Sequence, residues 1–144
     1  MTLSREARLV CGITLLTVPT VMYGGLTLLG LLTSGMAGMS PGELKLDEVQ
    51  WALFRAGHAH AGVWLILSLL MQVLLDPATL SPGWKWLARL SAPLAAVCVS
   101  GGFFGLAFLA GFQWLLYFGG ACLVVAVLVT GVGLLRRPAG EARS

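Results

Sequence analysis

Apolar residues along the chain fall into four runs, each close to the roughly 20 residues that a helix needs to cross the hydrocarbon core of a bilayer. The runs cover about residues 9–32, 52–75, 87–110 and 113–135. Asp76 and Pro77 end the second run, and paired arginines end the fourth. The pattern predicts an all-α, polytopic membrane protein in which residues 1–144 form a single four-helix transmembrane domain.

The composition excludes an ordinary soluble domain. Hydrophobic residues make up 58% of the 144 positions and charged residues 10%, against about 25% charged residues in a typical soluble domain. The net charge of +3 comes from cations at the ends of the apolar runs, not from a basic tract with interleaved aromatic residues. We therefore expect the lipid bilayer as a partner, and no nucleic acid.

The distribution of lysine and arginine predicts the orientation in the membrane. Of the nine cations, the larger group lies on one side of the predicted spans: Arg5, Arg8, Lys85, Arg89, Arg136, Arg137 and Arg143. The smaller group lies on the other side: Lys45 and Arg55. Because cytoplasmic loops carry the excess of Lys and Arg, both termini are predicted to be cytoplasmic. In this arrangement Lys85 and Arg89 flank the loop between the second and third spans.

The long connection between the first two spans, residues 33–50, is predicted to lie outside the membrane. Its S-P-G-E segment at residues 40–43 has the pattern of a capping box at a helix N-terminus. The residues that follow form either a short amphipathic helix at the outer interface or an extension of the second span. Met36 and Met39 carry the soft thioether that Cu(I) prefers and are candidate copper ligands, with an ordinary loop as the alternative.

Both histidines of the chain, His58 and His60, lie near the outer start of the second span. Positions i and i+2 of an α-helix point about 200° apart, so the two rings cannot comfortably hold one ion from an ideal helix. They can serve two sites, or one inward site and one structural contact. Glycine and alanine surround the pair in R-A-G-H-A-H-A-G, which leaves room for a flat ligand or for a neighbouring backbone.

The H-A-H-A-G segment resembles the H-x-H helix of the haem–copper oxidase large subunit and the histidine-rich helices of the NnrS family. It is also similar to small bacterial four-helix membrane proteins with an H-x-H in the second span. The resemblance covers residues 55–64 and the hydropathy profile. It implies a haem b- or copper-binding protein of the bacterial cytoplasmic (inner) membrane, engaged in electron transfer or metal handling. An oxidase has further histidines on other helices, which this chain lacks, so a haem would be five-coordinate, take a Met or Tyr as second ligand, or be shared across a dimer interface.

The candidate cofactor site lies in the outer half of the second span. His58 and His60 are candidate metal ligands, because imidazole binds both haem iron and copper. Arg55, one turn before His58, is the candidate partner of an anionic group on the cofactor. Tyr23 and Tyr117 are expected at the same depth and complete the candidate cofactor-binding set. Ionisable groups inside a membrane are costly, which makes this pair of imidazoles a functional candidate.

Other functions fit the same residues. The histidines can form hydrogen bonds across helices, meet water at the outer boundary, or act in a proton relay or pH sensor. The glycine- and alanine-rich helix faces fit a cofactor-free structural or accessory subunit that packs in a homo-oligomer or a larger membrane complex. No nucleophile, base and orienting group form a recognisable catalytic set, so the sequence neither predicts nor excludes an enzyme.

Overall fold

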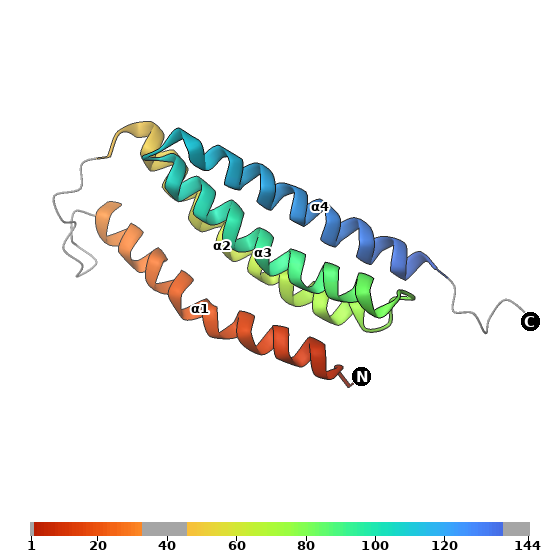
Figure 1. Ribbon diagram of the computed structural model, residues 1–144. Coiled ribbons are helices and arrows are strands. Elements are labelled where there is room, and N and C mark those ends of the chain that lie inside the picture. Colours follow the sequence, from red (N-terminus) through yellow and green to blue (C-terminus); the bar gives the residue numbers. More distant parts are fainter. Residues whose placement is uncertain (1, 33–45, 137–144) are drawn as a thin grey trace, which may run out of the picture.

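The computed structural model describes residues 2–32 and 46–136, and this part of the chain forms four long helices without a strand. They are α1 (Arg5–Leu32), α2 (Glu48–Leu75), α3 (Pro82–Leu106) and α4 (Gln113–Leu135), with a 3-10 turn at Ala110–Phe112. Consecutive helices run in opposite directions, so the start of α1 and the end of α4 lie at the same end of the bundle (Figure 1). All four helices are long and apolar enough to cross a membrane, which confirms the all-α prediction for the described residues.

The helix α3 lies at the centre of the bundle. It packs most extensively against α2 and α4, whereas α1 packs mainly against α2 and lies along the outer side of the other helices (Figure 1). In the most apolar stretch of α3, 56% of the residues are buried, against 11% in α1. The first helix is therefore the least enclosed part of the bundle.

The hairpin between α3 and α4 begins earlier than the sequence predicted. The third helix ends at Leu106 and not at residue 110. The Gly105 carbonyl accepts the N–H groups of Phe108 and Leu109 at 3.0 and 2.9 Å, and the backbone of Leu109 is then extended, with φ −139° and ψ 120°. A Cβ atom at position 105 would lie 2.0 Å from the Phe112 ring, so the ring occupies space that only glycine leaves free. The contact between the Phe112 ring and the backbone at Gly105 thus lies at the point where the chain turns from α3 into α4.

The second helix begins one turn before the predicted span, at Glu48. Asp47 is its N-cap: the Asp47 carboxylate accepts the Gln50 backbone N–H at 2.8 Å, and the Gln50 side chain accepts the Asp47 N–H at 3.0 Å. The Gln50 side-chain amide also donates to the Ala107 carbonyl at 2.9 Å, which ties the start of α2 to the end of α3. The capping box predicted at residues 40–43 lies outside the described residues. Of the two alternatives for the residues that follow it, the extension of the second span is found from Glu48 onward, because these residues form the first turn of α2.

The bundle end that holds the first residues of α1 contains a hydrogen-bonded set of polar side chains, here called the Asp76 cluster. Its members are Ser4, Gln72, Asp76, Lys85 and Arg89. The Arg89 Nη2 lies 2.5 Å from the Asp76 Oδ1, and the Ser4 backbone N–H and hydroxyl both donate to the same carboxylate, at 2.8 and 2.7 Å. The Gln72 amide oxygen accepts from Arg89 at 3.2 Å, and its amide nitrogen donates to the Arg89 carbonyl at 3.1 Å. These bonds fasten α1, α2 and α3 together.

The Asp76 cluster corrects one expectation. Arg89 does not flank a loop: it lies within α3, is 3% exposed and pairs with the carboxylate that follows α2. Lys85 also lies in α3 and donates to the Asp76 carbonyl at 2.8 Å. Burial raises the pKa of the Asp76 carboxyl, but the hydrogen bonds from Ser4 and Arg89 and the charge of Arg89 outweigh burial and hold that pKa below its usual value.

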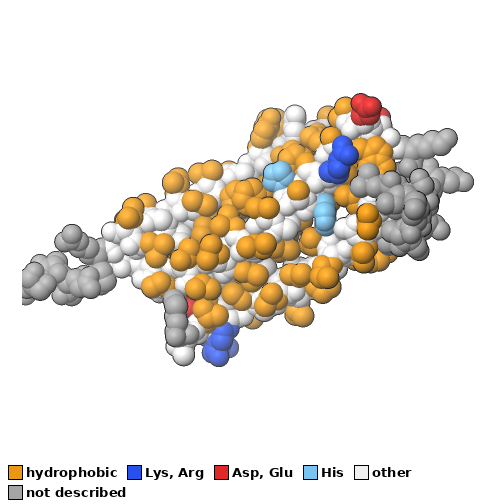
Figure 2. Space-filling view, turned by 180° about the vertical axis from the view of Figure 1, so that it is seen from behind, with side chains coloured by type: hydrophobic (Ala, Val, Ile, Leu, Met, Phe, Trp, Pro, Cys, Tyr) orange, Lys and Arg blue, Asp and Glu red, His pale blue; other side chains and the backbone are white. Residues whose placement is uncertain are grey.

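The outer surface of the helices is apolar along its length. Figure 2 shows hydrophobic side chains over the whole visible face, with charged side chains near the two ends. Large side chains in mid-helix are widely exposed, among them Leu16 at 81% and Ile66 at 70%. Such a surface suits acyl chains and not water.

Candidate functional site

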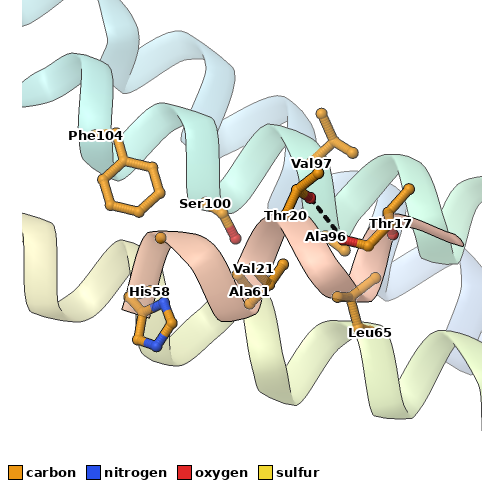
Figure 3. Close-up of a pocket in the computed structure, with 11 residues that line it drawn as sticks. Thr17, Thr20, Val21, His58, Ala61, Leu65, Ala96, Val97, Ser100 and Phe104 are labelled. Atoms are coloured by element: carbon orange, nitrogen blue, oxygen red, sulfur yellow. Dashed lines mark hydrogen bonds between the residues drawn. The ribbon is translucent and has the colours of Figure 1, made fainter. Parts of the chain in front are cut away.

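A cavity of about 340 Å³ lies between α1, α2 and α3 (Figure 3). The first helix contributes Thr17 and Thr20, the second contributes His58, and the third contributes Ser100 and Phe104. The remaining lining residues are small or aliphatic, and none of the lining residues is charged. The cavity is therefore an apolar space that a few polar groups enter.

His58 borders the cavity where its ring meets α1 at Gly25, a residue without a side chain. A Cβ atom at Gly25 would lie 2.9 Å from both Cε1 and Nε2 of the imidazole, so the ring rests against the bare α1 backbone. A second hollow of about 300 Å³, lined by aliphatic residues, two glycines and the thioether-bearing Met22, also borders His58. No hydrogen bond to the imidazole is found within residues 2–32 and 46–136.

Ser100 brings a free hydroxyl to the same cavity. The residue is 7% exposed, and its Oγ is buried without a hydrogen-bond partner among the residues that the structure describes. The hydroxyl points from α3 into the space near His58 (Figure 3). Ser91, two and a half turns earlier on α3, is also 7% exposed, but its hydroxyl donates to the Leu87 carbonyl at 2.7 Å. The same residue type at the same burial is thus satisfied at one place and unsatisfied at the other.

The two threonines of the cavity differ from Ser100. The Thr17 hydroxyl donates to the Thr14 carbonyl at 2.7 Å, and the Thr20 hydroxyl donates to the Thr17 carbonyl at 2.6 Å. Their protons are therefore used within α1. Among the described lining residues, the hydrogen-bond donors that remain free are those of the His58 imidazole and the Ser100 hydroxyl.

His60 has different surroundings. Its Nδ1 lies 2.7 Å from the Ala56 carbonyl oxygen, and since a carbonyl only accepts, Nδ1 carries the proton. The ring packs against Phe103 at a centroid distance of 4.8 Å and lies 5.8 Å from Trp64. The two histidine side chains are separate on the molecular surface (Figure 2), and only His58 lines the cavity.

The other candidate site residues do not gather at the cavity. Tyr23 and Tyr117 are exposed at 66% and 63%, and Tyr117 packs against Trp114. Arg55 is also exposed and is not a lining residue. Met36 and Met39 lie outside the described residues. Among the residues that are described, no group of three or more His, Cys, Asp and Glu side chains is placed to hold a metal ion.

Sequence reasoning missed the part that α3 plays in the site. Ser100 reads as a small packing residue in a row with Ala92 and Ala96, and this row is indeed buried. The signal that was available is the spacing of Ala96, Ser100 and Phe104, which places these residues on one face of α3. That face opens onto the cavity.

Comparison of the chain with known protein families, curated proteins and solved structures finds no match. The function is therefore argued from the cavity and its polar groups.

Proposed function

We propose that this chain is a multi-pass membrane protein that binds a small, lipid-soluble ligand or cofactor in the His58 cavity. The observation that supports this proposal is the presence of two polar side chains without partners, His58 and Ser100, in one apolar cavity. A buried hydroxyl without a hydrogen bond costs about 1–3 kcal/mol, and such a group in a native protein calls for an explanation. A bound ligand supplies the missing partner.

The proposed orientation places both termini in the cytoplasm and the His58 cavity in the outer half of a bacterial inner membrane. The excess of Lys and Arg near the ends of the chain supports it. The structure adds that α1 begins and α4 ends at the same end of the bundle, as this topology requires (Figure 1).

The test compares the two histidines. Protein with His58→Leu and protein with His60→Leu are purified in mild detergent beside the wild type, and co-purified small molecules are extracted and compared by mass spectrometry. We expect the wild type and His60→Leu to carry the same bound molecule and His58→Leu to lose it. His60→Leu is a matched control because it removes an imidazole two positions away that does not line the cavity. Equal recovery from all three proteins contradicts the proposal.

Haem b or copper is a narrower version of the same proposal, with His58 as the metal ligand. The free ring of His58 supports it, but the surroundings fit poorly. The lining residues include no second imidazole, thiolate or thioether, and no cation that would pair with haem propionates. An absorbance scan of purified protein tests this version directly, since a bound haem gives a Soret band that His58→Leu removes.

A structural or accessory subunit is the second candidate function, and open glycine positions on the outer faces favour it. A Cβ atom at Gly12, Gly120 or Gly131 would meet nothing within 4 Å, so another helix can approach the backbone there. Colourless, ligand-free protein that elutes from gel filtration with a stable partner or as a defined homo-oligomer would support this function over ligand binding.

A further inference from the structure

We infer that the ligand of the His58 cavity is a neutral, single-ring molecule that presents acceptor oxygens and carries an apolar tail, the chemical class of the quinones and quinols. This inference rests on the proposed function and narrows it to one kind of ligand. Three features of the cavity point to this class: its size, its free donors without charge, and its opening toward the lipid side.

The size of the cavity matches one substituted ring. An engineered apolar cavity of about 150 Å³ binds benzene, and the His58 cavity measures about 340 Å³. It thus holds a six-membered ring with several substituents. Phe104 at one end gives the ring an aromatic neighbour, while the rest of the wall is mainly aliphatic or small.

The free polar groups of the cavity favour a ligand that is uncharged and accepts hydrogen bonds. The Ser100 hydroxyl has no partner among the residues that the structure describes, the His58 imidazole carries at least one N–H, and both side chains line the cavity from different helices (Figure 3). Carbonyl oxygens on a ring accept from both groups. A carboxylate or phosphate would need a cation, and no Lys or Arg is found among the described residues that line the cavity. The ligand therefore enters as a neutral molecule.

The rim of the cavity leads out of the bundle between α1 and α3. Val97 lines the cavity and is 69% exposed, and Thr20 and Gly24 on the facing helix are exposed as well. In a bundle that spans a bilayer, exposed residues at this depth face acyl chains. A ligand that enters here arrives from the lipid phase, and its apolar tail can stay among the acyl chains. The tail therefore needs no space inside the cavity.

The experiment measures equilibrium binding of radiolabelled decylubiquinone to the full chain in nanodiscs, with empty nanodiscs giving the partition background. We expect saturable binding that Ser100→Ala weakens about 5- to 30-fold, since one hydrogen bond in a buried site is removed. His58→Leu abolishes the binding. Ser91→Ala, at the same burial on the same helix but with its hydroxyl bonded within α3, leaves binding unchanged.

A second probe tests the role of the oxygens. Excess decylbenzene has the same decyl tail on a plain six-membered carbon ring without acceptor oxygens, so it displaces decylubiquinone poorly if the inference holds. Equal displacement by both molecules overturns the inference, as does equal weakening by Ser100→Ala and Ser91→Ala. Gel filtration and the unfolding temperature of each variant show that it is folded.

The outcome also separates this inference from the proposed function. If decylubiquinone shows no saturable binding while the purified wild type carries another molecule that His58→Leu loses, the quinone class is overturned and the ligand site remains. If neither probe nor co-purified molecule depends on His58, both proposals fail.

Discussion

The Asp76 cluster and the His58 cavity use similar polar side chains in opposite ways. In the cluster, each of the side chains of Ser4, Gln72, Asp76 and Arg89 forms a hydrogen bond with at least one of the others, and these bonds hold three helices together. In the cavity, the buried Ser100 has no partner among the residues that the structure describes. A satisfied buried network stabilises one arrangement of helices, whereas an unsatisfied group lowers stability. Ser68 and Trp64 also have buried polar atoms without a partner among the described residues, but of these groups only Ser100 lines the cavity beside His58. The difference separates a structural site from a candidate binding site within one small bundle.

The largest expected effect comes from breaking the Asp76 cluster. Asp76→Ala leaves the guanidinium of Arg89 buried without its carboxylate, and removing one partner of a buried pair costs about 3–5 kcal/mol. We expect a correspondingly large drop in the unfolding temperature in detergent. Asp47→Ala is the control, because it removes an exposed N-cap carboxylate and costs about 1 kcal/mol. Equal losses from the two variants would contradict the structural role of the cluster.

Acid provides a second check on the same carboxylate. The pKa of Asp76 is lower in the folded protein than its unfolded value of about 3.9, so its contribution to stability is present above that value and is lost as the pH falls through the folded pKa. The wild type should therefore lose stability below about pH 4. Asp76→Asn cannot lose this contribution and should show a flatter acid profile in the same unfolding assay.

An intermediate effect is expected at the hairpin between α3 and α4. Gly105→Ala forces the Phe112 ring away from the α3 backbone, and overpacking of this kind costs about 1–3 kcal/mol. Gly111→Ala lies in the same hairpin with nothing within 4 Å of the added carbon, so it should have little effect. Thermal unfolding of the two variants measures the difference, and a loss from Gly111→Ala that matches that from Gly105→Ala would show that the ring contact does not set the turn.

The smallest expected effect is that of Ser100→Ala on stability, and its direction is opposite to that of most substitutions of buried residues. Ser100→Ala removes a buried hydroxyl without a partner, so protein without ligand should be as stable as the wild type or more stable, by up to about 1 kcal/mol. Ser91→Ala removes a hydroxyl that is bonded to Leu87, and it gains the same helix propensity from alanine. Unfolding in the absence of ligand should therefore rank Ser100→Ala above Ser91→Ala. The reverse order would mean that the Ser100 hydroxyl has a partner and that the cavity lacks a free donor there.

The sequence predicts the helices well because a run of apolar residues long enough to span a bilayer has few alternatives. It does not predict the Asp76 cluster, since Ser4 and Arg89 are far apart along the chain and only the packing of α1 against the other helices brings them together. A rule that counts Lys85 and Arg89 as flanking cations predicts an orientation but says nothing about the partners of these side chains.

The candidate site, like the fold, could be predicted from the sequence only in part. Helix geometry separates His58 from His60, but which ring meets a cavity depends on how α1 lies along α2. That register places Gly25 against His58 and leaves His60 with Phe103. The contribution of Ser100 depends on the rotation of α3, which hydrophobicity alone does not fix, because lipid-facing and buried positions in a membrane helix are both apolar.

The contact between the His58 ring and the α1 backbone at Gly25 has a consequence for how such a protein can change over evolution. An imidazole at position 58 and any side chain at position 25 compete for the same volume. Descendants of this chain that keep the imidazole in this position should therefore keep glycine at position 25, because a side chain there would turn the ring away, whereas lineages that replace the histidine with a small residue become free to vary there. The two positions should covary as a pair, although they lie on different helices and on either side of the long connecting loop.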